Sequence, residues 1–227
     1  MSRRLSIIVP VLDEAVGLGA TLHELQPLRA AGHEVVVVDG GSTDGTAELA
    51  RPLADRVLVA LRGRAAQMNA GADAASGDVL LFLHADTGLP PGADRAVLGG
   101  LAASGASWGR FDVRIEGRSP LLALVARLMN LRSRLTGIAT GDQAVFVTRT
   151  AFAAVGGFPA LALMEDVELS RRLKRVSPPL CVRQTVVTSG RRWESRGVVR
   201  TIALMWWLRL RYFLGASPER LRRIYYG

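Results

Sequence analysis

The sequence predicts an α/β protein with a mostly parallel sheet, because short apolar runs alternate with stretches of helical spacing through its first 86 residues. The four apolar runs lack clean polar alternation and lie at Leu5–Val11, Glu34–Asp39, Arg56–Ala60 and Asp78–Asp86. Such runs suit parallel strands that are buried on both faces. The stretches between them lie at Ala15–Ala31, Thr43–Ala50 and Arg64–Ala75. We therefore expect the order β-α-β-α-β-α-β.

After residue 100 the pattern becomes mixed. Ser107–Ile115 alternates like an exposed or antiparallel strand, Ser119–Leu135 has the spacing of an amphipathic helix, and Gln143–Thr148 resembles another strand. A helix over about 164–175, a strand near 181–188 and a terminal helix over 198–214 complete the prediction. We expect one globular domain over residues 1–197, followed by a basic amphipathic helix and tail over residues 198–227.

Composition supports one domain and indicates where an anionic partner would bind. With 227 residues and 49% apolar content, the chain is long enough to bury one core. Residues 1–100 carry 8 Lys or Arg against 12 Asp or Glu, a balance of −4, so the net charge of +9 leaves +13 for residues 101–227. Nucleic acid ranks last as a partner, because no binding motif accompanies this charge.

The chain carries no recognisable secretion or membrane signal. Asp13 and Glu14 interrupt the N-terminal apolar run too early for a signal peptide. No stretch reaches the ~18 to 20 consecutive apolar residues of a membrane span. The single cysteine, Cys181, allows no intrachain disulfide. We therefore expect a cytoplasmic protein.

Carboxylates directly follow the predicted strands, and this is where open parallel sheets bind ligands. Asp39 begins the turn DGGSTDGT, whose glycine and lysine pattern matches neither a P-loop nor the dinucleotide fingerprint. Its carboxylate can accept hydrogen bonds from a uracil or guanine base, or it can serve as a turn former or helix cap. Asp86 ends the fourth run and suits Mg²⁺ or Mn²⁺ shared with phosphate oxygens. His84 is a second ligand or a diphosphate donor there, or a buried histidine bonded to a neighbouring turn.

Two downstream segments carry further candidates. Glu165 and Asp166 begin a predicted helix, where either can act as a general base without a large pKa shift, or simply balance arginines later in the helix. In GRRWE, Arg192 can neutralise a leaving diphosphate and Trp193 can stack on a ring, or the segment is a solvated basic turn. Four candidate acceptor contacts, for which packing and turn formation are equally plausible roles, are Trp108, Arg110, Asp142 and Gln143.

Eight segments, in order and spacing, resemble the family-2 glycosyltransferases of the GT-A fold. They are PVLDE, VVVVDGGSTDGT, RGRAAQMNAG, LLFLHAD, GDQAVFV, VGGF, MEDVELSRRL and GRRW. The resemblance spans roughly residues 5–195. It implies a Rossmann-like, mostly parallel sheet with helices on both faces, a nucleotide-binding part over about 1–100 and an acceptor part over about 101–197.

By this resemblance, Asp39 reads the base, usually uracil. Pro10 and Glu14 make the first nucleotide contact, and Arg64 lies against the nucleotide-sugar. Gly40 stands where the second acid of the common DDGS turn would be, which puts the choice of base in doubt.

The same resemblance assigns the reaction residues. Asp86 matches the metal-binding Asp of the DxD motif, and Asp166 matches the base of the ED pair. Arg192 and Trp193 match the RW of a QxxRW-type element whose Gln is missing here. Because His84 replaces the first Asp of DxD, we expect weaker binding of Mg²⁺ or Mn²⁺ than at a two-Asp site.

Our hypothesis is an inverting transfer from a nucleotide-sugar donor, UDP-linked by this resemblance, to a small-molecule or lipid-linked acceptor. SWGRFDVR, LMNLRSRLTGIATGDQA and LMEDVELSRRLKR look more narrowly like the small bacterial arsenosugar-biosynthesis or radical-SAM/selenodomain-associated transferases. Two alternatives stay open: a polyprenyl-phosphate transferase at the membrane surface, and a non-catalytic nucleotide-sugar-binding homologue. Thr201–Gly215 favours core packing or an oligomer contact, with peripheral association with anionic lipid as the second interpretation.

Overall fold

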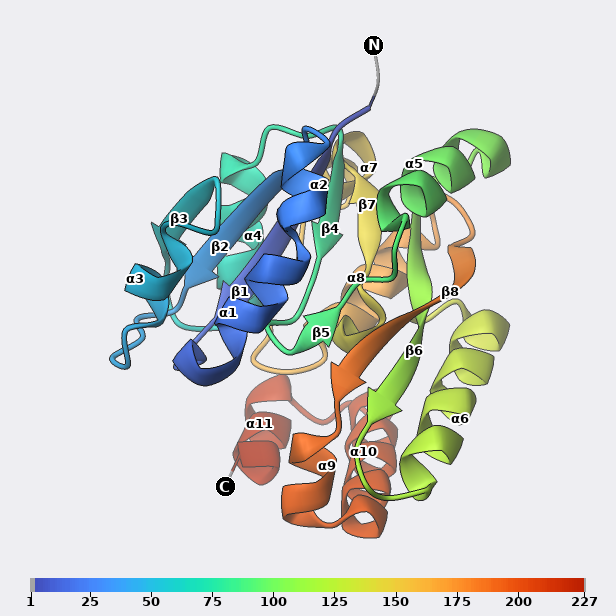
Figure 1. Ribbon diagram of the computed structural model, residues 1–227. Coiled ribbons are helices and arrows are strands. Elements are labelled where there is room, and N and C mark those ends of the chain that lie inside the picture. Colours follow the sequence, from blue (N-terminus) through green and yellow to red (C-terminus); the bar gives the residue numbers. More distant parts are fainter. Residues whose placement is uncertain (1–2, 227) are drawn as a thin grey trace.

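The computed structural model describes residues 3–226, apart from the side chains of Arg192 and Tyr226. Within this range the strands form one sheet in the order β3-β2-β1-β4-β7-β6-β8-β5 (Figure 1). The strands are β1 Leu5–Val11, β2 Glu34–Asp39, β3 Arg56–Val59, β4 Val79–Phe82, β5 Thr87–Gly88, β6 Trp108–Glu116, β7 Phe146–Thr148 and β8 Leu180–Ser189. The first four neighbours in the sheet are parallel, as the sequence predicts.

The second half of the chain completes the sheet with mixed pairing. β7 is antiparallel to both β4 and β6, whereas β6 and β8 run parallel, and the short β5 closes the edge against β8. The helices are α1 Ala15–Glu24, α2 Gln26–Ala30, α3 Thr46–Ala50, α4 Arg64–Ala74, α5 Ala93–Ser104, α6 Leu121–Thr136, α7 Arg149–Ala154, α8 Glu165–Leu173, α9 Arg191–Arg196, α10 Val198–Phe213 and α11 Pro218–Tyr226. The mixed architecture expected after residue 100 is therefore confirmed.

Helices cover both faces of the sheet, and each face has its own core. Alternate residues of a strand point to opposite faces, so Ile7 and Val9 of β1 join the core beneath α1, α5 and α6. Ile8 joins the core beneath α4, α7 and α8. α4 approaches the sheet closely at Gly71, where an added Cβ would lie 2.5 Å from Ile8 Cγ2 and 2.9 Å from Val38 Cγ2.

The C-terminal helices form a third, smaller core. Leu208 of α10 and Leu221 of α11 are fully buried against Met164 and Val167, which flank the start of α8. In Figure 1, α9, α10 and α11 lie together below the sheet and beside α6. Over residues 198–226 the sequence predicts one helix and a tail, and the structure has the two helices α10 and α11 in this described range. None of the helices among the described residues is long and apolar enough to span a bilayer.

Two predicted strand boundaries are wrong in a way that matters for the site. β4 ends at Phe82, and the segment after it turns, with Thr87 N donating to His84 O over 3.1 Å. His84 and Asp86 are therefore turn residues and do not belong to the strand. Gln143 likewise belongs to a single 3-10 turn, Gly141–Gln143, and β7 begins only at Phe146.

Candidate active site

A cavity of about 1480 Å³ opens where the carboxyl ends of β1 and β4 meet α8 and the C-terminal helices. Most of the residues expected at a donor or reaction site line it together: Pro10, Glu14, Arg64, His84, Asp86, Asp142, Glu165, Asp166 and Trp193. They come from strand ends, the start of α4, the 3-10 turn, α8 and α9. The tertiary fold thus brings these segments of the sequence to one place.

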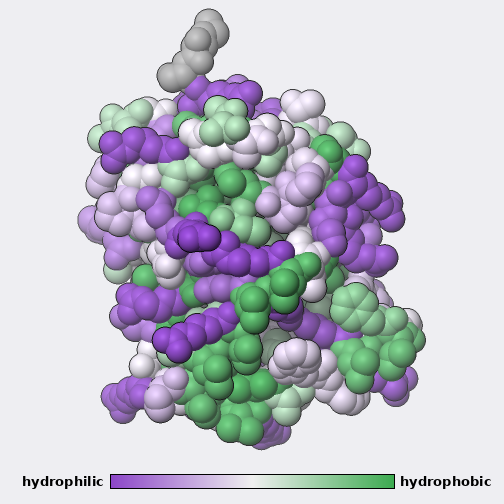
Figure 2. All heavy atoms as spheres, turned by 90° about the vertical axis from the view of Figure 1, so that its right-hand side faces the viewer, coloured by the Kyte–Doolittle hydropathy of each residue, from purple (hydrophilic) through white to green (hydrophobic). Residues whose placement is uncertain are grey.

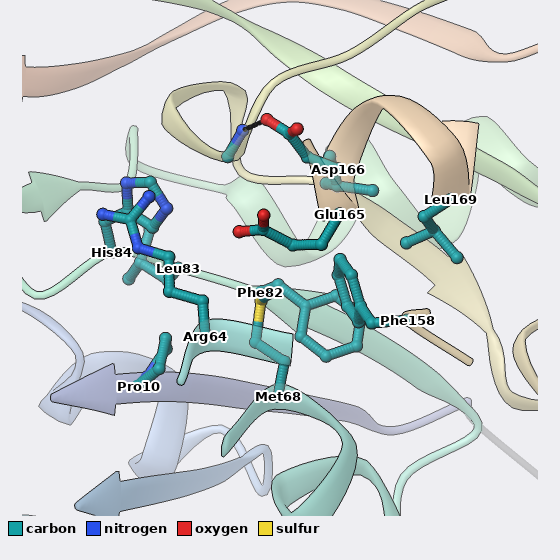
Figure 3. A pocket seen from close by; sticks show the side chains of 12 residues that line it. Pro10, Arg64, Met68, Phe82, Leu83, His84, Phe158, Glu165, Asp166 and Leu169 are labelled. Atoms are coloured by element: carbon teal, nitrogen blue, oxygen red, sulfur yellow. Dashed lines mark hydrogen bonds between the residues drawn. The ribbon is translucent and has the colours of Figure 1, made fainter. Parts of the chain in front are cut away.

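Glu165 and Asp166 lie at the start of α8, after Met164 enters the helix with a φ of 69°. Figure 3 shows the Glu165 carboxylate pointing into the pocket from α8, toward the side that carries Arg64 and His84. The carboxylate of Asp166 lies above that of Glu165 in this view, and its Oδ2 accepts a hydrogen bond from Gly141 N over 3.0 Å. Both carboxylates therefore line the cavity, and the backbone of the turn at Gly141 holds that of Asp166.

Burial changes the ionisation of this pair. It raises the pKa of Glu165 to about 7, and repulsion from Asp166 adds to the shift, while Arg64 opposes it. Burial also raises the pKa of Asp166, against the backbone hydrogen bonds from Gly141 and Val167. The expectation of a base with little pKa shift is thus wrong, because the helix start is buried where the sequence implies exposure.

The turn Gly141–Gln143 joins His84 to Asp166. Gln143 closes a capping box with Thr140, which fixes the turn. Asp142 Oδ1 lies 3.1 Å from His84 Nδ1, and an added Cβ at Gly141 would lie 2.4 Å from His84 Nε2. Both ring nitrogens therefore face the turn. This geometry favours the alternative of a histidine bonded to a neighbouring turn over the expected metal ligand.

Asp86 is exposed at the mouth of the cavity, and its backbone oxygen accepts from Ser189 N over 3.2 Å at the end of β8. Among residues 3–226, no group of three or more His, Cys, Asp or Glu side chains is placed to hold a metal ion. A divalent cation at Asp86 would thus depend on oxygens of a bound diphosphate for its remaining ligands.

Asp39 is buried and organises its own turn. Its carboxylate accepts hydrogen bonds from Gly41 N, from Ser42 N over 3.0 Å, and from the Ser42 hydroxyl. It does not line the cavity. The turn-forming alternative is therefore what the structure shows, and contact with a nucleotide base stays a prediction.

Three of the expected acceptor contacts lie in the interior instead. Trp108 has no exposed surface, and its indole N–H donates to Ser177 O over 2.9 Å. The side chain of Gln143 is buried and bonded to Thr140 in the capping box, and Arg110 is fully buried and paired with Asp112. An acceptor cannot reach these side chains, so those predictions are wrong for a shared reason: alternating or turn-forming residues in a sequence do not reveal which sheet face is covered.

The arginines at the site include some that sequence reasoning missed. Arg191 Nη2 lies 3.5 Å from Glu14 Oε2, so α9 reaches across to the end of β1. Arg132 lines the cavity from α6. The side chain of Arg192, expected to neutralise the leaving group, lies outside the described residues, although its backbone belongs to α9. The signal in the sequence that could have found Arg132 is the helical spacing of residues 119–135, which places it on the same helix face as Leu128 and Leu135.

The sheet order and the strand-end cavity define a GT-A fold. A mannosyltransferase from Pyrobaculum calidifontis, in complex with GDP-Man and Mn²⁺, superposes with a TM-score of 0.62 at 22% identity, over 82% of this chain and 57% of that one. Glucosyl-3-phosphoglycerate synthase from Mycobacterium tuberculosis, in complex with Mg²⁺ and UDP, gives 0.62 at 20% identity, over 82% and 70%. At these identities the likeness concerns the fold.

The chain belongs to glycosyl transferase family 2, whose model matches residues 6–151. The succinoglycan biosynthesis protein ExoA of Rhizobium meliloti is 30% identical over an alignment of 192 residues that covers 74% of this chain and 57% of that protein. A PGL/p-HBAD biosynthesis glycosyltransferase of Mycobacterium bovis is 40% identical over 91 residues, 37% of this chain and 36% of that protein. The chain therefore spans about a third of the length of this mycobacterial relative.

Proposed function

We propose that this protein transfers a sugar from a UDP-sugar to an acceptor hydroxyl, with inversion at the anomeric carbon. The observation that carries the proposal is the convergence of Glu165 and Asp166 with the strand-end residues Pro10, Glu14 and Asp86 on one cavity. A donor bound at the strand ends would present its anomeric carbon to the carboxylate pair. Family membership and the donor complexes of the structural neighbours support this assignment.

One displacement accounts for the reaction. Asp166 removes the proton of the acceptor hydroxyl, the hydroxyl oxygen bonds to the anomeric carbon, and the bond from that carbon to the diphosphate oxygen breaks. The electron pair leaves with UDP. The raised pKa of Asp166 suits this role, because the carboxylate then competes well for a proton. Glu165, with a pKa of about 7, would share the proton with it.

The leaving diphosphate needs positive charge. Asp86 is the residue that would hold Mg²⁺ or Mn²⁺ together with the diphosphate, and such a cation would offset charge on the departing oxygens. Arg64 lines the same end of the cavity, and Arg192 is the second cation we assign to the leaving group. Structural neighbours that contain Mn²⁺ or Mg²⁺ with a nucleotide support the metal. With one exposed carboxylate and no three-residue cluster among the described residues, we expect the metal to bind weakly until UDP is present.

The first test measures donor recognition. Isothermal titration of UDP, with and without Mn²⁺, should show tighter binding with the metal, and Asp86→Asn should remove that difference while leaving metal-free UDP binding nearly unchanged. GDP and TDP titrated in parallel identify the base. Failure to bind any of the three nucleotides would overturn the assignment, and Mn²⁺ binding without UDP as tight as at a two-Asp site would overturn the weak-metal expectation.

The second test concerns Asp166. In the absence of an acceptor, water can take its place and still needs a base. We therefore expect Asp166→Asn to slow hydrolysis of the UDP-sugar by about 10²-fold or more, with UDP affinity unchanged. Asp73→Asn, an exposed carboxylate on α4, is the matched control and should retain the wild-type rate. Slow UDP release from the wild type with no hydrolysis or transfer would instead favour the non-catalytic homologue.

We infer a cytoplasmic protein that associates peripherally with an anionic membrane surface. α10 exposes Trp206, Trp207 and Phe213, with 65%, 43% and 66% of their surfaces accessible, and arginines lie between them. Aromatic and cationic side chains on one helix suit a lipid interface. The narrower relation to the arsenosugar or radical-SAM/selenodomain-associated transferases stays a prediction.

A further inference from the structure

The cavity continues well beyond the residues assigned to the donor. Its far part lies between α6 and the C-terminal helices and has an apolar wall from α6. The leucines of this wall recur every three or four residues and keep 39–77% of their surfaces exposed; they are Leu121, Leu124, Leu128, Leu131 and Leu135. Figure 2 shows hydrophobic side chains gathered over the lower half of the molecule. We call these five residues the leucine stripe.

The leucine stripe is separate from the part of α6 that stabilises the fold. Leu122 and Ala126 on the same helix are buried in the core against the sheet. Residues three and four apart on a helix share a face, so the stripe forms a second apolar face that the core leaves uncovered. Contiguous exposed apolar surface of this kind commonly marks a binding site. Here it lies inside the cavity that also contains the carboxylate pair.

Arg132 lies on the same helix, between two leucines of the stripe, and also lines the cavity. Its Nε and Nη2 atoms are buried and have no hydrogen-bond acceptor among the described residues. Burial lowers the pKa of this guanidinium, and the charges of Asp166 and Arg110 act on it in opposite directions. Asp112, the acidic partner of Arg110, is also paired with Arg134.

Two buried guanidinium nitrogens without an acceptor are costly, and a phosphate at this guanidinium would supply charge-assisted hydrogen bonds. Other arginines that line the cavity, Arg191, Arg196, Arg209 and Arg222, make the surroundings favourable to an anion. A purely hydrophilic ligand would leave the leucine stripe without an apolar partner. A purely apolar ligand would leave the arginines without an anion. A ligand with both features matches the observed surface.

We propose that the leucine stripe and Arg132 bind the acceptor as a lipid, with its apolar chain along the stripe and a phosphate of its hydroxylated head group on Arg132. Because Arg132 is near enough to Asp166 for their charges to interact, a phosphate there would place a neighbouring hydroxyl beside the base. This rests on the proposed function, because only a transferase needs an acceptor at Asp166. The phosphate is a recognition group, and the hydroxyl remains the nucleophile.

The head-group half of the proposal is tested with decyl phosphate, kept below its micelle concentration, by isothermal titration on the full chain. We expect binding that Arg132→Gln weakens at least about tenfold, the loss of a charged hydrogen bond. Arg127→Gln, an exposed arginine on the same helix that does not line the cavity, should bind like the wild type. Equal losses in both variants would mean a general charge effect and would overturn the role of Arg132.

The chain half is tested with paired leucine substitutions. Leu124→Gln/Leu128→Gln changes two exposed residues of the stripe, so the fold should survive, and it should weaken decyl phosphate at least about tenfold while leaving competition by inorganic phosphate unchanged. Leu210→Gln, 58% exposed on α10 and outside the cavity lining, is the control. Decyl phosphate that binds no more tightly than inorganic phosphate would overturn the lipid chain.

Two further outcomes separate the possible errors. UDP titrated into the same variants should bind as in the wild type. A wild-type chain that binds UDP but does not bind decyl phosphate refutes the acceptor site alone. Absence of UDP binding refutes the proposed function itself. Sedimentation that shows a dimer in the wild type and a monomer in Leu124→Gln/Leu128→Gln would assign the stripe to a second copy of the chain and overturn the proposal.

Discussion

Glu165 illustrates how much one side chain depends on its surroundings. In the sequence it is an acidic residue in the first turn of a helix, a position usually solvated and stabilised by the helix dipole. In the structure only 8% of its surface is exposed, and Asp166 is its neighbour. The free energy of burying the ionised carboxylate is what raises its pKa to about 7.

This shift predicts a pH dependence of stability. The folded-state pKa is raised, so between about pH 4.5 and pH 7 the folded protein binds more protons at Glu165 than the unfolded chain, and stability falls as pH rises through that window. Over this range the free energy of unfolding should fall by on the order of 3 kcal/mol because of Glu165, and Glu165→Gln should remove that fall. Urea unfolding at half-unit pH intervals measures it.

Glu48→Gln, an exposed first-turn glutamate of α3, is the control and should leave the pH profile of the wild type intact. A Glu165→Gln profile parallel to that of the wild type would show that Glu165 ionises at its ordinary pKa. The carboxylate pair would then lack the mutual repulsion on which the proposed proton sharing depends.

At the scale of elements, the position of the site depends on how closely α4 packs on the sheet. Arg64 and Gln67 begin this helix, and Gln67 Nε2 donates to Val11 O over 2.8 Å and to Val38 O over 2.9 Å. These bonds satisfy the ends of β1 and β2 beside the Asp39 turn. Gly71, one turn further on, permits the approach because it lacks a Cβ.

Gly71→Ala should therefore destabilise the protein by about 1–3 kcal/mol, since the new methyl group overlaps Ile8 and Val38. Gly99→Ala in α5 is a matched substitution, because nothing lies within 4 Å of the added Cβ. It should be neutral or stabilising by up to about 1 kcal/mol through helix propensity. Denaturant midpoints of the two variants make the comparison, and equal effects would mean that α4 does not pack as described.

At the scale of the whole molecule, the C-terminal helices are part of the site. Leu208 and Leu221 bury Met164 and Val167, the residues on either side of the carboxylate pair. Removing residues 198–227 would therefore expose the start of α8, so a truncation cannot separate membrane binding from folding. Substitutions of exposed residues are the better experiment.

We expect the full chain to sediment with vesicles that contain phosphatidylglycerol, and to do so less at high salt because the attraction to the basic half is screened. Trp207→Ser/Phe213→Ser should reduce the bound fraction several-fold without lowering the thermal midpoint, since both residues are exposed. Val16→Ser, fully exposed on α1, should bind like the wild type. Binding that is indifferent to Trp207 and Phe213 would assign α10 to another contact.

The sequence by itself determined the parallel half of the sheet and the residues at its strand ends. Runs such as Leu5–Val11 and Glu34–Asp39 are apolar at most of their buried positions, so their length and their β-branched, non-alternating composition identify them as strands. The order of eight short motifs identified the family. Local pattern is sufficient for both, because neither depends on contacts between distant segments.

Only the tertiary structure decided which of those residues meet. Trp108 and Gln143 became core residues, His84 turned toward Asp142, and Arg132 joined the cavity, because long-range packing determines which faces are covered. α5 and α7 escaped prediction as well: their small, weakly patterned segments are helical through packing on the sheet. The carboxylates Asp39 and Asp86 follow their strands as predicted. Asp39 is buried and accepts hydrogen bonds from its own turn, whereas Asp86 is exposed at the cavity.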